Sequence, residues 1–294
     1  MASHEVRAEE FAFDAPGGVR LLGRAWTPSS PPRAAIAIVH GYAEHSGRYD
    51  WTGRQLAARG YAVYACDLRG HGRSDGERVF VRSFNEHLDD VSTLLDQVRE
   101  RQPGIPIFLL GHSMGGCIAA LMMVTRRPRI DGVLLSGAVL TPARGLRASL
   151  MGRVMQLLLR IAPHGKMRPL DAGAVSRDPA VAAAYASDPL VHHAGMPFST
   201  LAALVRATKA IEHRAARITA PVLVMHGSAD ALVSPRGSDW LHETVSSPDR
   251  LLKIYEGLHH EILNEPEREQ VLADIAAWLD ARTKPAAASQ PAAM

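Results

Sequence analysis

A serine flanked by glycines, between an apolar segment and a helix-like segment, constrains this chain more than any other feature. Residues 111–115 read GHSMG and fit the pattern G-x-S-x-G. The apolar residues 105–110 are typical of a strand buried on both faces, and residues 116–123 are typical of a helix. At a sharp strand-to-helix turn, the glycines leave room for neighbouring backbone and the serine hydroxyl is exposed. The pattern therefore predicts a nucleophile at Ser113.

Two downstream loops supply the groups that a serine nucleophile needs, which are a base for its proton and an acid to orient that base. Strand-like residues 221–225 precede a polar loop with Asp230 at its tip. Strand-like residues 251–255 precede the adjacent histidines His259 and His260. This order predicts Asp230 as the acid. Because neighbouring side chains point in different directions, the spacing leaves either histidine as the base.

An attacking serine also needs N–H donors for the oxyanion that forms on the carbonyl oxygen. One donor usually follows the nucleophile, and the other comes from a loop after an earlier strand. The apolar residues 34–39 have the character of such a strand, and His40-Gly41-Tyr42 begins the loop after it. We therefore expect the backbone N–H groups of Tyr42 and Met114 to be the donors.

The order of strand-like and helix-like segments predicts an α/β fold. Strand-like residues 10–14 and 21–26 flank Gly17-Gly18, which predicts an opening hairpin. Strand and helix signals then alternate to residue 136, as in a mostly parallel sheet flanked by helices. The alternation stops at residue 141 and a strand signal returns at residue 221. We therefore predict a core at 1–140 and 209–283, with a helical cap inserted at 141–208 between core strands.

The predicted cap contains apolar side chains at near-helical spacing. We expect this face to line an acyl channel through Leu146, Leu150, Val154 and Leu158. Arginines lie beside this face, so a transient contact of the cap with an anionic lipid surface is the alternative. Gly152 interrupts the apolar face, which favours the covering and lining role. The Ala- and Pro-rich residues 284–294 are predicted to be a disordered tail.

Composition excludes several other classes of function. The net charge is +3 over 294 residues and the basic residues are dispersed, so no nucleic-acid partner is expected. Cys66 and Cys117 fall in strand-like and helix-like segments and are expected to be buried. The sequence contains no metal or dinucleotide motif, so we expect no metal ion and no cofactor. No signal region and no bilayer-spanning apolar run is present, so a cytoplasmic location is expected, with peripheral contact at membrane surfaces as the alternative.

Four segments together carry a narrower resemblance. They read HGYAEHSGRY at 40–49, DLRGHGRS at 67–74, GHSMGG at 111–116 and HGSAD at 226–230. In this combination the chain resembles the monoacylglycerol lipase branch of the α/β-hydrolases, over about residues 10–282. Segments 176–179, 188–193 and 264–267 resemble bacterial members in particular.

The resemblance implies an α/β-hydrolase fold and assigns roles to further residues. It implies that His260 is the base, since the family histidine ends this loop, and His259 stands where the family commonly has an aromatic residue. It also implies that Glu44 and Arg48 position the glycerol end of the substrate; the alternatives are a surface ion pair or a loop brace. Mammalian members carry a histidine where this chain has Leu263, which implies a less polar glycerol pocket.

These observations predict a serine hydrolase that cleaves monoacylglycerols to fatty acid and glycerol through an acyl-enzyme. The alternative is a lysophospholipase or short-chain carboxylesterase with the same three residues. A haloalkane dehalogenase or an epoxide hydrolase would have an aspartate in place of Ser113. A ligand receptor that retains Ser113, Asp230 and His260 is the remaining possibility, and labelling by a serine-reactive probe distinguishes it.

Overall fold

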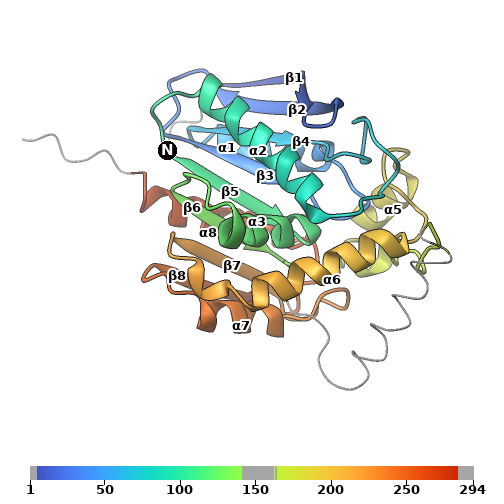
Figure 1. Ribbon diagram of the computed structural model, residues 1–294. Coiled ribbons are helices and arrows are strands. Elements are labelled where there is room, and N and C mark those ends of the chain that lie inside the picture. The colour runs from blue at the N-terminus through green and yellow to red at the C-terminus, as the bar shows by residue number, and fades with distance from the viewer. Residues whose placement is uncertain (1–4, 141–161, 163, 284–294) are drawn as a thin grey trace, which may run out of the picture.

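The centre of the molecule is an eight-stranded sheet with the strand order β1-β2-β4-β3-β5-β6-β7-β8 (Figure 1). The structure is a computed structural model that describes residues 5–140, 162 and 164–283. The hairpin of β1 (Val6–Ala15) and β2 (Val19–Pro28) is antiparallel, and β2 also pairs antiparallel with β4. All other neighbouring strands pair parallel: β3 (Ala34–Val39), β4 (Tyr61–Cys66), β5 (Ile107–His112), β6 (Gly132–Ser136), β7 (Val222–Gly227) and β8 (Arg250–Tyr255).

Helices cover both faces of the sheet, which confirms the predicted α/β-hydrolase architecture. One face packs against α2, α3, α6 and α7, and the other packs against α1 and α8. The described α-helices are α1 (Asp50–Ala57), α2 (Phe84–Arg101), α3 (Met114–Thr125), α5 (Pro179–Ser187), α6 (Phe198–Glu212), α7 (Arg236–Thr244) and α8 (Arg268–Asp280). Short 3₁₀ helices are η1 (Ser46–Tyr49), η2 (Ala172–Ala174) and η3 (Ala215–Arg217).

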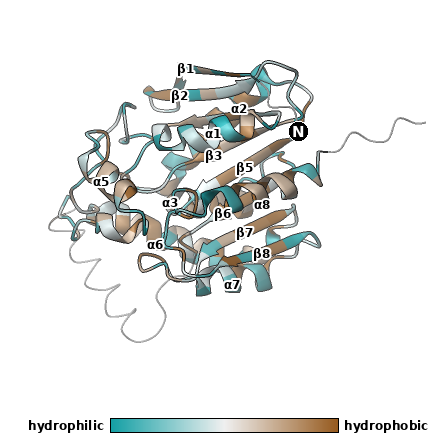
Figure 2. Ribbon diagram, turned by 180° about the vertical axis from the view of Figure 1, so that it is seen from behind, coloured by the Kyte–Doolittle hydropathy of each residue, from teal (hydrophilic) through white to brown (hydrophobic). Residues whose placement is uncertain are grey.

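Burial explains why the central strands read as continuous apolar runs. Every residue of β3, β4, β5, β6 and β7 is buried, because helices cover both faces (Figure 2). The edge strand β8 is partly exposed along its whole length. Cys66 and Cys117 are buried free thiols, as expected, and burial raises the pKa of both.

Several element boundaries differ from the sequence predictions by a few residues. β5 begins at Ile107 and runs through His112, so the first two residues of the GHSMG segment belong to the strand. The last helix, α8, begins at Arg268, two residues after Pro266. Before it, the Arg268 N–H donates to the Glu265 carbonyl and closes a tight turn.

The described part of the segment between β6 and β7 contains η2, α5, α6 and η3. Helix α6 crosses residue 208, and its buried Ala203, Ala207 and Ile211 join the main core. The proposed cap boundary at residue 208 therefore falls inside a helix that already packs on the core. Leu146, Leu150, Val154 and Leu158, like the tail 284–294, lie outside the described residues. Within the described ranges, no helix is long and apolar enough to cross a membrane.

Candidate active site

Ser113 occupies the turn between β5 and α3 in a conformation that L-amino acids rarely adopt. Its φ of 54° and ψ of −117° mark a strained residue, as expected at a nucleophile elbow. A Cβ added at Gly111 would lie 2.4 Å from the Gly115 oxygen, and one at Gly115 would lie 2.1 Å from the Val39 oxygen. Both positions thus exclude a side chain. Ser113 is partly exposed, whereas both of its chain neighbours are buried.

Asp230 is held by hydrogen bonds on both carboxylate oxygens. Its Oδ1 accepts the backbone N–H groups of Leu232 and Val233, each at 2.9 Å. Its Oδ2 lies 2.6 Å from His260 Nδ1 and 2.9 Å from His226 Nε2. Burial would raise the pKa of Asp230, but the hydrogen bonds from His226 and His260 lower it well below its usual range. Asp230 is therefore ionised and can orient His260.

Close approach of two glycines brings the His260 loop against the ends of β6 and β7. A Cβ added at Gly227 would lie 2.2 Å from the Leu258 oxygen, and one at Gly137 would lie 3.2 Å from His260 Nδ1. The Ser113 N–H donates to the Ser136 oxygen at 2.9 Å. Ser113, Asp230 and His260 therefore gather at the carboxyl ends of the adjacent strands β5, β6 and β7. Within the described residues no hydrogen bond joins Ser113 Oγ to His260, and in free enzymes such bonds are often long before substrate binds.

The two adjacent histidines have different environments. The His259 N–H donates to Glu265 Oε1 at 3.1 Å, and its buried Nδ1 has no hydrogen-bond partner among the described residues. His260 alone of the two contacts Asp230. This arrangement favours His260 as the base.

The loop that carries Tyr42 lies directly against Ser113. A Cβ added at Gly41 would lie 3.1 Å from Ser113 Cβ. His40 holds this loop, because its Nδ1–H donates to the Gly41 oxygen at 2.7 Å while its Nε2 accepts the Leu68 N–H at 2.9 Å. Neither the Tyr42 amide nor the Met114 amide donates to another described residue. Both are thus available as oxyanion donors.

Glu44 and Arg48 belong to a buried charge network. Glu44 Oε1 accepts the Gly41 N–H at 2.6 Å and the Tyr49 hydroxyl at 2.9 Å, and its Oε2 accepts Arg48 Nη1 at 2.9 Å. Arg48 also donates to both carboxylate oxygens of Glu261, at 2.6 and 2.7 Å. The network joins the Tyr42 loop to the His260 loop, so the loop-brace interpretation of Glu44 and Arg48 has direct support.

This network was only partly predictable from sequence. Glu261 and His226 contact the predicted site residues, yet sequence reasoning assigned them no role. Only their positions in the sequence could have pointed to these two residues, because Glu261 directly follows His260 and His226 precedes Asp230 by four residues. Among the described residues, no group of three His, Cys, Asp or Glu side chains is placed to hold a metal ion.

Buried charges determine the protonation states near the site. Burial would raise the pKa of Glu44, but Arg48, followed by His112 and His40, lowers it to about 2. Burial is the main cause that lowers the pKa of His112 to about 4, and the neighbouring His260 is the second. The centroids of the His112 and His260 rings lie 4.8 Å apart, so a neutral His112 adds no positive charge beside His260.

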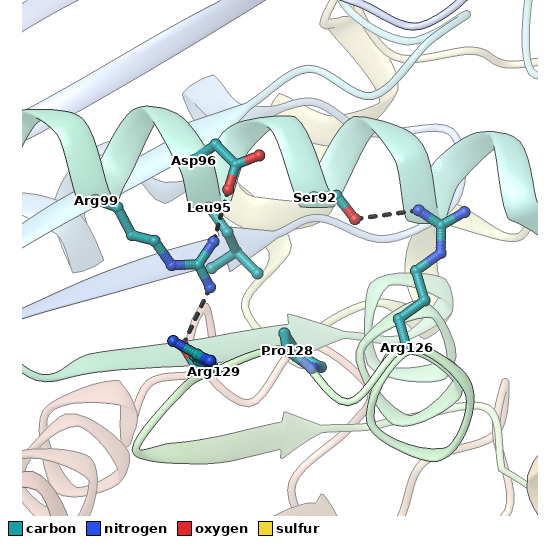
Figure 3. Close-up of a pocket in the computed structure, with 7 residues that line it drawn as sticks. All are labelled: Ser92, Leu95, Asp96, Arg99, Arg126, Pro128 and Arg129. Carbon is teal, nitrogen blue, oxygen red and sulfur yellow. Dashed lines mark hydrogen bonds and ion pairs between the residues drawn. The ribbon is translucent and has the colours of Figure 1, made fainter.

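Two hollows differ in their relation to this site. The smaller hollow has a volume of about 10 Å³, which is close to the space of one water. It is lined by Glu44, Tyr49, His112, Glu261, Leu263 and Asn264. A larger one of about 400 Å³ lies between α2 and the segment after α3 (Figure 3). There Arg99 pairs with Asp96 and Arg126 donates to Ser92 Oγ. Because Ser113 directly precedes α3 and this hollow lies beyond the other end of the helix, the larger hollow is separate from the candidate active site.

Comparisons with known proteins align with most of this chain. The family described as serine aminopeptidase, S33, matches residues 30–267. A monoacylglycerol lipase of Mycolicibacterium smegmatis is 42% identical over 270 residues, covering 92% of this chain and 96% of the relative. The chain belongs to the monoacylglycerol lipase family of the α/β-hydrolases.

Further relatives of the family agree with this assignment. The human monoglyceride lipase is 37% identical over 279 residues, covering 93% of this chain and 91% of the human protein. The crystal structure of the Paleococcus ferrophilus monoacylglycerol lipase is 30% identical, with a TM-score of 0.76. That match covers 95% of this chain and 99% of the solved one. The resemblance seen in the sequence motifs is therefore confirmed at the level of the family and the fold.

The lowered pKa of His112 predicts a pH-dependent stability. Unfolded His112 binds a proton below pH 6.5, whereas the folded form stays neutral down to about pH 4. The unfolded state therefore binds more protons in this window, and the free energy of unfolding should fall as the pH is lowered from 6.5 to about 4. Urea unfolding across this window measures the slope, which should be shallower in His112→Gln. An unchanged slope in that variant would show that other groups cause the loss.

Proposed function

We propose that this protein hydrolyses monoacylglycerols to fatty acid and glycerol, with Ser113, Asp230 and His260 as its catalytic residues. The observation that carries the proposal is the contact of Asp230 with His260 next to the strained Ser113, in a chain that aligns over 92% of its length with a monoacylglycerol lipase. Membership of this family makes the protein a carboxylic ester hydrolase that acts on lipid esters.

The proposed reaction has two halves. In the first, His260 Nε2 accepts the Ser113 hydroxyl proton as Ser113 Oγ attacks the ester carbonyl carbon. The Tyr42 and Met114 N–H groups stabilise the oxyanion, and collapse of the intermediate breaks the ester bond as His260 protonates the departing glycerol oxygen. In the second, His260 accepts a proton from water, the resulting hydroxide attacks the acyl-enzyme, and the fatty acid leaves as Ser113 regains its proton.

The acyl chain and the cap belong to this proposal as well. We propose that the apolar face formed by Leu146, Leu150, Val154 and Leu158 lines the acyl channel, with transient contact of the cap with lipid surfaces. These residues lie outside the described ranges, and their near-helical spacing in the sequence supports the proposal. A cytoplasmic location remains a proposal of the same kind.

The substrate is tested by measuring fatty-acid release from a panel of esters. The panel contains monoacylglycerols, diacylglycerols, lysophosphatidylcholine and p-nitrophenyl esters of graded chain length. We expect the highest kcat/KM for a monoacylglycerol. A higher kcat/KM for lysophosphatidylcholine or for a short p-nitrophenyl ester would instead identify a lysophospholipase or a short-chain carboxylesterase with the same catalytic residues.

A substitution at Arg48 separates the two interpretations of the Glu44 and Arg48 pair. If these side chains bind glycerol, Arg48→Lys should lower kcat/KM for monoacylglycerol by about 10-fold more than for a p-nitrophenyl ester of the same acyl chain. Loss of one hydrogen bond to a charged group has about this effect. If the pair only braces the loop, both substrates lose activity equally.

Arg54→Lys is the matched control for this substitution. Arg54 forms an exposed ion pair with Asp50 on α1, and exposed pairs contribute little to stability. The control should leave both kcat/KM values unchanged. Equal losses in Arg48→Lys and Arg54→Lys would remove the case for any special role of Arg48.

A further inference from the structure

His226 is a wholly buried histidine that contacts the acid of the candidate active site. It is the penultimate residue of β7 and has no exposed surface. Its Nε2 lies 2.9 Å from Asp230 Oδ2 and 3.0 Å from the Val233 carbonyl oxygen. Its Nδ1 lies 2.7 Å from the Ser238 hydroxyl. Both ring nitrogens are therefore engaged.

The partners of the ring determine which nitrogen carries the proton. A carbonyl oxygen and an ionised carboxylate can only accept hydrogen bonds, so Nε2 must be the donor. In the neutral ring, Nδ1 then accepts the proton of the Ser238 hydroxyl. Ser238 is fully buried on α7, and its backbone N–H donates to the Pro235 oxygen at 2.8 Å. The orientation of His226 is thus set from both sides.

The hydrogen bond from His226 occupies the last acceptor position of the Asp230 carboxylate. Oδ2 accepts from both His226 and His260, while Oδ1 accepts two backbone N–H groups. With four donors around it, the carboxylate cannot rotate away from His260. If His226 were absent, Oδ2 would keep a single partner, which is the ring that must itself be oriented.

We propose that His226 is a positioning residue for ester hydrolysis, because its Nε2–H holds Asp230 Oδ2 where the His260 Nδ1–H meets it. The inference rests on the proposed function of Ser113, Asp230 and His260. His226 does not contact the reacting atoms and acts through Asp230. Ser238 contributes by keeping the Nε2 proton of His226 directed at Asp230.

A purely structural role of His226 predicts a different outcome, because hydrogen bonds with Val233 and Ser238 are enough to satisfy both ring nitrogens of a buried histidine. A stability role would lower the fraction of folded enzyme without changing the turnover of each folded molecule. A positioning role lowers kcat per active site and leaves KM unchanged, because ground-state binding is untouched. The quantity to measure is therefore kcat divided by the concentration of sites titrated with a fluorophosphonate.

The test compares His226→Leu with His226→Gln in the full chain. Leucine removes the donor, and we expect kcat per titrated site to fall by about 10- to 100-fold, the effect of losing one hydrogen bond to a charged group. The glutamine amide nitrogen reaches about as far as Nε2 and keeps a donor for Asp230, so His226→Gln should recover most of the activity. Ser238→Ala should give a smaller loss than His226→Leu.

Leu241→Ala is the matched control for destabilisation. Leu241 is fully buried on the same helix as Ser238, and its truncation weakens packing without removing a hydrogen bond. We expect a lower melting temperature with an unchanged kcat per titrated site. The inference is overturned if His226→Leu retains the wild-type value, or if His226→Gln is as impaired as His226→Leu. A wild-type protein that neither hydrolyses esters nor reacts with the fluorophosphonate would instead contradict the proposed function.

Discussion

Ser113→Ala is expected to lower kcat for ester hydrolysis by about 10⁶-fold, the loss seen when the nucleophile of a serine triad is removed. Without the Ser113 hydroxyl, no oxygen is positioned to attack the carbonyl carbon and no acyl-enzyme forms. Residual hydrolysis would depend on the oxyanion donors and on substrate binding alone. Two readouts apply, which are fatty-acid release and covalent labelling by a fluorophosphonate probe.

A buried serine far from β5 serves as the control for this substitution. The Ser247 hydroxyl, just before β8, donates to the Asp249 oxygen at 2.9 Å and is fully buried. Ser247→Ala should therefore retain both hydrolysis and labelling. Labelling that persisted in Ser113→Ala would place the reactive serine elsewhere and would refute the proposed nucleophile.

Local geometry explains why the fold and the sharp turn at Ser113 were predictable from sequence. The two glycines around Ser113 occupy positions where a Cβ would overlap backbone atoms. Both positions therefore require glycine, and the GHSMG segment shows this directly. The central strands are buried on both faces, which makes them continuous apolar runs that are easily recognised. These features leave a local pattern in the sequence, although the contact of Gly115 with Val39 is itself a tertiary one.

The parts of the candidate site that could not be predicted from sequence depend on contacts between loops that are far apart in the chain. Sequence spacing could not decide between His259 and His260, because the choice depends on the direction in which the loop after β8 approaches Asp230. The same holds for Glu261, whose partner Arg48 lies 213 positions earlier in the chain. Such long-range pairs leave no periodic pattern in the sequence, so only the folded arrangement brings them together.

The proposal that His260 rather than His259 is the base predicts the second large loss of activity. His260→Gln is expected to lower kcat by about 10⁶-fold, because in a serine triad loss of the base costs as much as loss of the nucleophile. His259→Gln should retain most of the activity, since the His259 side chain makes no contact with Asp230 and only its backbone N–H binds Glu265. Steady-state kinetics on one ester substrate measure both variants.

The double variant Ser113→Ala/His260→Gln provides a stricter test of the same assignment. Residues that act as one catalytic unit have non-additive effects, so the double variant should be no slower than either single variant. Two independent contributions would instead multiply and give a far larger loss. If His259→Gln rather than His260→Gln abolished hydrolysis, the base would be His259, and the 2.6 Å contact between His260 and Asp230 would have only a structural role.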